Sequence, residues 1–204
     1  GSLRAGQLSA DICIEGDDYF FTGLFNTGGP IESFIRWNGR FTSIGRFVGR
    51  VPRSTAYLVM EENLRKGNSK IVLAAHGTTT VHGRKRTSKI MDLPPGDDLM
   101  SALFLSGGCR REMVVHDGED PYEIDLIDIK AGDAVKQGAD HFAGDADRCK
   151  YRFTYHTGRV RKIDVWHAQV SGHEFPVRIR IRVPIFPDAV LRLRNPSLTD
   201  SDNQ

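Results

Sequence analysis

The stretch Cys149-Lys150-Tyr151-Arg152-Phe153-Thr154-Tyr155 alternates between apolar and polar side chains. Because successive side chains of a β-strand point to opposite faces, this pattern predicts a strand with one buried and one solvated face. The same alternation recurs at residues 122–126, 177–183 and 191–194. Strands of this kind are typical of antiparallel sheets, which commonly expose one face to water.

Weaker strand patterns fill much of the remaining chain, and turn sequences separate them. These patterns lie at residues 19–24, 33–37, 40–48, 56–61, 70–75, 78–82, 113–116 and 162–167. The turn signals are Thr27-Gly28-Gly29-Pro30, Asn38-Gly39, Lys66-Gly67-Asn68, Asp117-Gly118 and Thr157-Gly158. Asn38-Gly39 is the sharpest hairpin prediction, because both residues tolerate positive φ. The pattern predicts an all-β fold, either a strongly curled antiparallel sheet or an open β-barrel of about ten or more strands.

The domain organisation follows from the same pattern. We expect a single β-barrel-like domain over residues 3–194, followed by a disordered tail over residues 195–204. The Gly- and Asp-rich residues 130–147 are expected to form a long surface loop.

One short helix is predicted at residues 98–105. Pro94-Pro95-Gly96 stops the preceding strand, Asp97 offers a helix N-cap, and Gly107-Gly108 ends the apolar stripe that follows. We expect this helix to fill the open end or the concave face of the sheet.

The cysteines indicate the compartment. Cys109 and Cys149 flank an acidic, strand-like segment, and their pairing would close a loop of about 40 residues, worth on the order of 4 kcal/mol. Two unbonded thiols are the alternative. Cys13 would remain free as a small side chain on a strand. A disulfide favours an oxidising compartment such as the periplasm.

Composition sets broad limits on function. The chain has 204 residues, of which 39% are hydrophobic and 26% charged, with a formal net charge of +2. These values are typical of a folded domain and give no reason to expect nucleic-acid or membrane binding. No apolar run approaches the roughly 18 residues of a transmembrane helix. The opening Gly1-Ser2 is typical of an expression remnant, so we expect that a signal peptide has been removed.

No catalytic or metal-binding motif is recognisable. Nucleophile elbows, phosphate-binding glycine loops, paired Cys-x-x-Cys sites and His-Glu-x-x-His are all missing. The seven histidines include no pair at the i, i+2 spacing that places two ligands on one face of a strand. We therefore expect no catalytic residues, no metal and no cofactor.

An arginine stripe is the most distinctive charged feature. Arg178, Arg180 and Arg182 project from one face of a predicted strand, and Arg192 and Arg194 from a predicted neighbour. One interpretation is a solvated outer face with carboxylates across the strands. The other is a basic docking face for an acidic partner protein or anionic lipid headgroups, with peripheral membrane contact. Nucleic acid is disfavoured because interleaved exposed aromatic residues are lacking.

Aromatic residues suggest an apolar interior. Trp37, Phe104 and Trp166 are among those that could line the concave face of a curled sheet. If the sheet curls incompletely, an apolar groove between helix and sheet remains, and barrels of that size hold amphiphiles in other proteins.

Several motifs together resemble one family. They are residues 3–6 (Leu-Arg-Ala-Gly), Tyr19, residues 43–52 from Ser-Ile-Gly to Pro, residues 94–101 (Pro-Pro-Gly-Asp-Asp-Leu-Met-Ser), Cys109, residues 115–118 (Val-His-Asp-Gly), residues 149–153 (Cys-Lys-Tyr-Arg-Phe), Val165-Trp166 and residues 175–179 (Phe-Pro-Val-Arg-Ile). Over roughly residues 3–194 the chain resembles the bacterial domain-of-unknown-function family 3108. The resemblance implies export to the periplasm or cell envelope, a β-rich barrel-like fold and a pairing of Cys109 with Cys149. It supplies no active site.

These observations lead to two functional hypotheses. The first is a non-enzymatic periplasmic protein that supports cell-envelope integrity by binding a partner protein or an amphiphilic, lipid-like ligand. The alternative is a hydrolase or carbohydrate-binding protein that acts on an envelope polymer, using an exposed Trp37 or Trp166 beside Asp and His residues.

Overall fold

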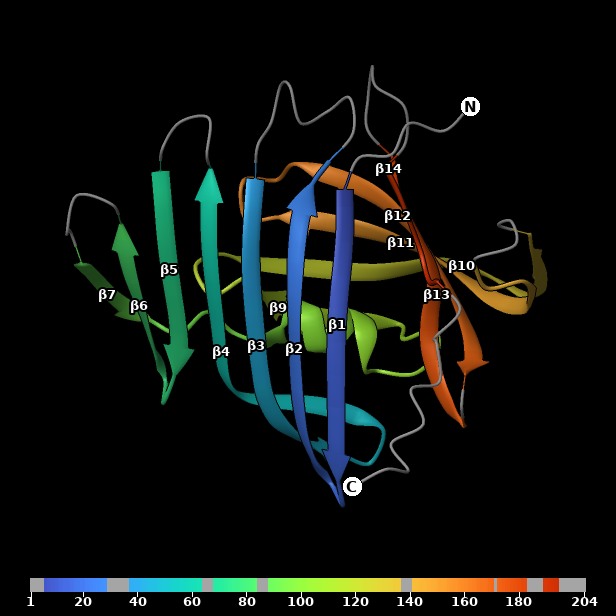
Figure 1. Ribbon diagram of the computed structural model, residues 1–204, viewed down its shortest axis with the longest axis horizontal. Helices are drawn as coiled ribbons and strands as arrows, with labels where there is room; N and C mark the ends of the chain where they lie inside the picture. Colours follow the sequence, from blue (N-terminus) through green and yellow to red (C-terminus); the bar gives the residue numbers. More distant parts are fainter. Residues whose placement is uncertain are drawn as a thin grey trace, which may run out of the picture.

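The chain folds into two seven-stranded sheets with one short helix between them (Figure 1). The computed structural model describes residues 6–28, 37–63, 68–83, 88–136, 141–170, 172–182 and 189–194. Turn or strand predictions at residues 29–36 and 66–67, and the predicted tail at 195–204, lie outside these residues. The all-β fold, the curled sheet and the single short helix are confirmed, although the strands form two sheets where one was expected.

Sheet A is an antiparallel meander in which each strand pairs with the next along the chain. Its strands are β1 (Gly6–Glu15), β2 (Asp18–Thr27), β3 (Trp37–Val48), β4 (Val51–Asn63), β5 (Asn68–Ala75), β6 (Thr78–Gly83) and β7 (Ser88–Asp92). A register shift between Ile44 and Gly45 marks a bulge at the β3–β4 ladder, where these long strands bend.

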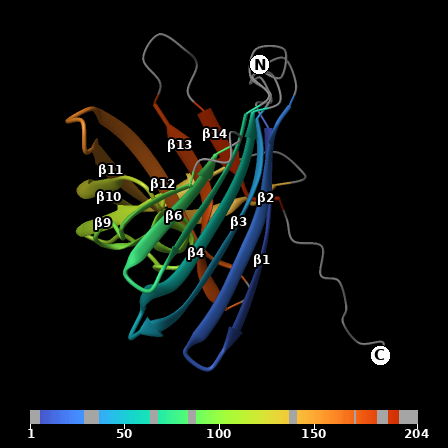
Figure 2. The same cartoon turned by 90° about the vertical axis from the view of Figure 1, so that its left-hand side faces the viewer.

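Sheet B follows the same meander and curls into a half-barrel. Its strands are β8 (Asp97–Asp98), β9 (Glu112–His116), β10 (Pro121–Val135), β11 (Gly144–Tyr155), β12 (Val160–Val170), β13 (His173–Ile181) and β14 (Ala189–Arg192). All of its described pairs are antiparallel except the short parallel pair β8–β9. Figures 1 and 2 show sheet B behind sheet A, with its strands running across those of sheet A.

Helix α1 (Leu99–Phe104) lies between the two layers and packs against both. Ala102 belongs to the apolar cluster on sheet B, Leu105 to the cluster on sheet A, and Phe104 contacts both clusters. The helix therefore lies between two sheets, where the sequence predicted that it would fill the open end or the concave face of one. No helix in the described part of the chain is long and apolar enough to cross a bilayer.

Two predictions of turns and loops are wrong. Asn38 and Gly39 lie inside β3, where they pair with Asn26 and Phe25 of β2. A Cβ at Gly39 would lie 2.2 Å from the Phe25 ring, so the glycine serves close packing and not a turn. The predicted loop at residues 130–147 is largely strand, because β10 extends to Val135 and β11 begins at Gly144.

The disulfide between Cys109 and Cys149 is present, with Cα atoms 5.3 Å apart. It attaches the segment that follows α1 to the centre of β11, and Cys149 is fully buried in the sheet B core. Cys13 is a free, exposed thiol on β1.

Candidate functional site

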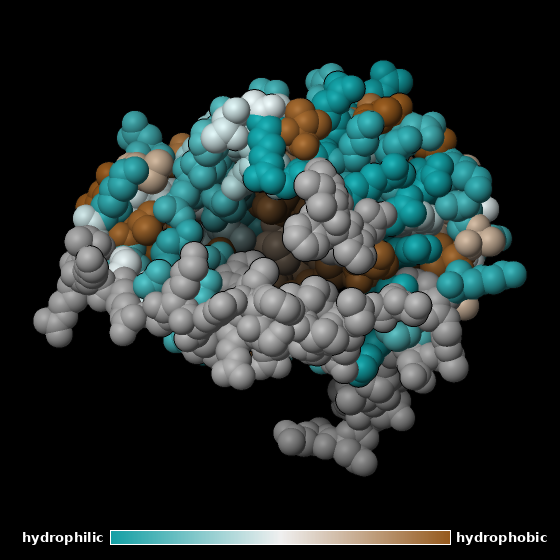
Figure 3. Space-filling view, turned by 90° about the horizontal axis from the view of Figure 1, so that it is seen from above, coloured by the Kyte–Doolittle hydropathy of each residue, from teal (hydrophilic) through white to brown (hydrophobic). Residues whose placement is uncertain are grey.

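An apolar hollow opens between the two sheets at the edge viewed in Figure 3. The side chains visible inside it are hydrophobic, and hydrophilic side chains cover much of the neighbouring surface of the molecule. This edge is the upper one in Figure 1, where the ladders of β1, β2 and β3 end.

Burial changes along the inward face of sheet A toward this edge. Phe21 and Phe41, in the middle of the sheet, are 0% and 1% exposed and pack edge to face with ring centroids 4.9 Å apart. Leu8 and Phe25, which face each other across the β1–β2 ladder, are only half-buried. On sheet B, the inward Ile181 is also half-buried. Apolar side chains that face the interior are thus incompletely covered at this end.

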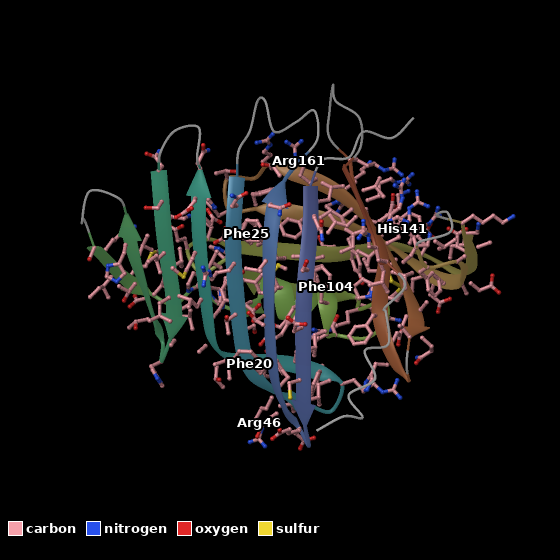
Figure 4. The ribbon with its side chains drawn as sticks, in the orientation of Figure 1. Phe20, Phe25, Arg46, Phe104, His141 and Arg161 are labelled. Carbon is pink, nitrogen blue, oxygen red and sulfur yellow. A yellow bond between two sulfur atoms is a disulfide. The ribbon has the colours of Figure 1, made fainter. Side chains whose placement is uncertain are left out.

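Among the described residues, the cation Arg161 lies beside the hollow. Arg161 stands opposite Phe153 in the β11–β12 ladder and therefore shares the inward face of sheet B. Figure 4 places Arg161 at the upper edge, above the labels of Phe25 and Phe104. No described side chain forms an ion pair with it. An apolar space with the cation Arg161 at its rim matches the two parts of an anionic amphiphile.

The three residues predicted to line a groove have separate positions. Phe104 lies between the sheets. Trp166 does not, because it follows the inward Val165 and points to the outer face of β12, where it is 3% exposed. Trp37 begins β3, and its side chain lies outside the described atoms. A buried Trp166 offers no platform for stacking a sugar ring.

A buried polar junction holds α1 against sheet A. Asp98, and not the predicted Asp97, is the N-cap of α1, and its Oδ1 accepts the Ser101 backbone N–H at 2.9 Å. Its Oδ2 accepts hydroxyl hydrogens from Ser43 of β3 at 2.6 Å and from Ser101 at 2.7 Å. The Asp98 N–H donates to the Ser54 hydroxyl at 3.0 Å.

Neighbouring groups extend this junction. Asp97 accepts a hydrogen bond from the Arg53 guanidinium at 2.9 Å, although burial still raises the pKa of its carboxyl above the usual value. His116 is the register partner of Asp98 in the parallel β8–β9 pair. It is 2% exposed, and burial lowers its pKa. Its Nδ1 accepts the Gly118 N–H at 3.2 Å.

The junction has the features of a structural tie. Asp98 and Ser101 are 0% exposed, and every partner of the Asp98 carboxylate comes from the protein itself. A substrate would have to displace these bonds to reach the carboxylate. The residues belong to the Pro-Pro-Gly-Asp-Asp-Leu-Met-Ser and Val-His-Asp-Gly motifs, so these motifs meet where the two layers join.

A large basic surface covers the outside of sheet B. Alternation places eight cations on the outer face of β11 to β14, with Arg182 just after β13. We call this set the basic face: Arg148, Lys150, Arg152, Lys162, Arg178, Arg180, Arg182 and Arg192. Four of the five arginines predicted from sequence belong to it. The fifth, Arg194, follows β14 and forms an isolated bridge to His141, labelled in Figure 4.

Counter-charges lie within the basic face and along its border with β10. Asp164, which is 1% exposed, accepts hydrogen bonds from Arg180 at 2.6 and 3.0 Å and from Arg182 at 3.3 Å. It is the only carboxylate at the described outward positions of β11 to β14, but on the neighbouring strand β10 Asp125 stands opposite Arg152 and Asp128 opposite Lys150. Asp128 also lies 3.9 Å from the Arg148 guanidinium, and Asp133 of β10 accepts the Trp166 Nε1–H at 2.8 Å.

Arg178 lies over the Trp166 ring, 4.6 Å from its centroid, and the buried Nε of Arg178 has no hydrogen-bond partner. Burial, together with Arg180 and Arg192, lowers the pKa of Arg178.

The sequence prediction missed four members of the basic face, although a signal for two of them was present. Lys150 and Arg152 alternate with Tyr151 and Phe153 in the stretch that predicts β11, so their outward position was available from that pattern. Arg148 and Lys162 become part of the face only through the pairing of β11 with β12.

Two shallow depressions occur elsewhere on sheet B. One, of about 320 Å³, is lined by several polar groups that include Asp145, Asp147, His167 and Glu174. His167 is 4% exposed, and burial lowers its pKa to about 4. No three His, Cys, Asp or Glu residues within the described ranges are arranged to hold a metal ion.

Residues 1–194 match the model of a protein family that is described as "Protein of unknown function (DUF3108)". No curated protein and no solved structure is significantly similar to the chain.

Proposed function

We propose that this chain, which belongs to the DUF3108 family, is a non-enzymatic protein of the periplasmic cell envelope that binds an anionic amphiphile between its two sheets. The observation that carries the proposal is the apolar hollow between the layers (Figure 3). The proposed role is to support envelope integrity by holding or carrying this ligand.

The hollow has the chemistry that an acyl chain requires. Leu8, Phe25 and Ile181 face the interior but keep part of their surface exposed. Covering apolar surface is favourable by about 25 cal/mol per Å², so a bound hydrocarbon chain would gain free energy there. Arg161 at the rim would pair with an anionic headgroup.

The disulfide supports the proposed compartment. Cys109–Cys149 bonds persist where thiols are not continually reduced, and the bacterial periplasm is such a place.

Extraction and direct binding test the proposal. Protein purified from periplasm without detergent should release an amphiphile on solvent extraction, detected by mass spectrometry. Delipidated protein should bind oleate in calorimetry, and Arg161→Gln should weaken binding by about tenfold, the loss of one partly exposed charge-assisted hydrogen bond.

Lys162→Gln is the matched control. Lys162 follows Arg161 on the same strand but points to the opposite face of sheet B, so its loss should leave oleate affinity unchanged. Absence of extracted amphiphile together with no oleate binding would refute the proposal. If Arg161→Gln and Lys162→Gln weakened oleate binding equally, the hollow would not be the binding site.

A partner protein is the second candidate, and a different surface favours it. The outer face of sheet A exposes several large apolar side chains, which are typical of contact surfaces. They are Phe20 (46%), Leu24 (60%), Ile44 (44%), Leu73 (44%) and Ile90 (72%). Photo-crosslinking in cells from position 24, but not from the exposed position of Lys162 on the outer face of sheet B, would support this candidate.

A further inference from the structure

Cations are concentrated at the outward positions of β11 to β14. These positions hold eight of the 28 Lys and Arg residues and one of the 26 Asp and Glu residues, Asp164, while Asp125 and Asp128 of β10 border them on one side. The rest of the chain therefore carries more acidic than basic residues, although the total is only +2. The net charge does not report this uneven distribution of charge, which creates a positive potential at the basic face.

The basic face extends in two dimensions. One row across the strands runs Arg148–Trp166–Arg178–Arg192, a second contains Lys150, Asp164 and Arg180, and a third contains Arg152 and Lys162, with Arg182 beside them. With neighbouring strands spaced by about 4.8 Å, the first row spans four strands and about 14 Å, and the other two span three strands and about 10 Å. Neither of the two depressions described on sheet B is lined by any member of the face.

The basic face lacks the centre of a typical protein interface. Such interfaces place exposed aromatic or aliphatic anchors at a desolvated core. Here the central aromatic residue, Trp166, is 3% exposed and lies beneath Arg178 and Arg180, at 4.6 and 5.5 Å from its ring centroid. A surface that offers charge without apolar anchors fits a diffuse anionic surface better than a folded partner.

We propose that the basic face docks the protein onto the phosphate headgroups of an anionic bilayer. Phosphates spread in two dimensions match cations that spread in rows and need no groove. The exposed members Arg152, Lys162, Arg182 and Arg192 supply charged N–H donors that hydrogen-bond to headgroup oxygens. This surface is opposite the inward face of sheet B, so the proposal does not depend on the ligand in the hollow.

Vesicle binding tests the proposal. Delipidated protein should co-sediment with vesicles of phosphatidylglycerol and phosphatidylcholine, but not with vesicles of phosphatidylcholine alone. Binding should fall steeply as salt rises, because the Debye length shrinks from about 10 Å at 0.1 M to about 3 Å at 1 M. Each cation near an anionic surface contributes about fivefold in partition coefficient.

Charge reversal identifies the surface. Arg152, Lys162 and Arg192 are exposed members of the basic face, and changing all three to Glu should lower the partition coefficient by more than about 100-fold. The matched control changes Arg40, Arg46 and Arg50, which are exposed on sheet A or its β3–β4 turn, to Glu. It has the same net charge and should bind vesicles nearly as the native protein does.

Three other results would refute docking of the basic face onto a bilayer. Equal losses in the two triple variants, or equal binding to both kinds of vesicle, would overturn the proposal. Displacement from vesicles by millimolar inorganic phosphate at constant ionic strength would also overturn it, because a discrete phosphate site would then explain the binding. Arg192→Lys should retain binding, since a diffuse interaction needs charge and not guanidinium geometry.

Discussion

Asp98 is the side chain through which helix α1 is fixed to sheet A. Its carboxylate caps the helix and accepts hydroxyl hydrogens from Ser43 and Ser101 in a place that water does not reach. The tyrosine hydroxyl of Tyr19 lies 3.4 Å from Ser43, and burial raises the pKa of Tyr19 to about 12. One buried carboxylate thus organises groups from two strands and the helix.

Asp98→Ala should lower the free energy of unfolding by about 2–4 kcal/mol, because it removes an N-cap and leaves two buried hydroxyls without their acceptor. Urea denaturation measures the change. Asp92→Ala, at an exposed end of β7, is the control and should change stability by less than about 0.5 kcal/mol. A loss below about 1 kcal/mol for Asp98→Ala would contradict the role assigned to this residue.

His167 makes stability depend on pH. Burial lowers its pKa from 6.5 to about 4, so the unfolded chain binds this proton first as the pH falls. The free energy of unfolding is therefore unaffected by His167 above pH 6.5. Between pH 6.5 and pH 4 it falls progressively, by about 3 kcal/mol in total, because protonating His167 favours the unfolded chain. His167→Gln should remove that part of the pH dependence, which urea titrations of both proteins at several pH values would reveal. Parallel stability curves for the two proteins would show that His167 does not titrate in this way.

The helix cap shows what sequence can predict for single residues. The Asp97-Asp98 pair and Gly107-Gly108 correctly indicate where the helix begins and ends, but the cap shifts by one residue. Both aspartates satisfy the local pattern, and the choice is made by Ser43, which is 55 residues away from Asp98 in sequence. Local propensity contains no information on such a partner.

Among the elements, β3 contradicts the strongest turn signal in the chain. Asn38-Gly39 has hairpin composition, yet the Phe25 ring occupies the space beside Gly39, and the Met60 carbonyl oxygen would lie 2.7 Å from a Cβ there. A turn and a close approach of backbone both select glycine, so the residue type alone cannot distinguish them. Cross-strand packing decided the outcome.

Gly39→Ala should therefore destabilise the protein by about 1–3 kcal/mol through overpacking. The control is Gly28→Ala, because the nearest atom to a Cβ at Gly28 is 3.9 Å away and no positive φ is required. Thermal unfolding of both variants measures the difference. Similar melting temperatures for Gly39→Ala and the native protein would mean that the Phe25 ring can move aside.

The β10–β11 hairpin was also longer than expected. Gly and Asp residues at 130–147 suggested a loop, but register shifts near Ile127 and between Lys130 and Asp133 absorb the irregular residues while pairing continues. Bulges of this kind bend and twist a sheet, and here they accompany the curl of sheet B. The Gly- and Asp-rich composition thus correctly predicts irregular backbone. In the structure this irregular backbone takes the form of register shifts within the paired strands.

At the scale of the whole molecule, alternation predicted the strand content well but not the division into two sheets. A period-two pattern identifies the buried face of a strand. It does not show which opposing layer packs against that face. The short segment between β7 and β8 makes this division, because Gly96, with φ of 98°, passes so close to Val114 that any Cβ would clash with its carbonyl oxygen.

The disulfide should contribute to the stability of the whole chain. Its two cysteines are 40 residues apart, so removing both by substitution with Ser should cost about 4 kcal/mol by the entropy of the unfolded chain. Cys13→Ser, at the exposed free thiol, should have no effect. Denaturation of both variants without reductant tests this expectation. An unchanged midpoint in the double variant would show that the bond is not needed to hold the segment after α1.

The division of the interior into separate apolar clusters has a mechanical consequence. Where facing layers meet through one helix and leave incompletely covered side chains, the folded molecule encloses volume that the unfolded chain does not. Hydrostatic pressure favours the smaller volume and should unfold the empty protein more readily than a uniformly filled β-protein of equal stability. A molecule seated in the hollow would occupy that volume, so cargo would make the protein resistant to compression.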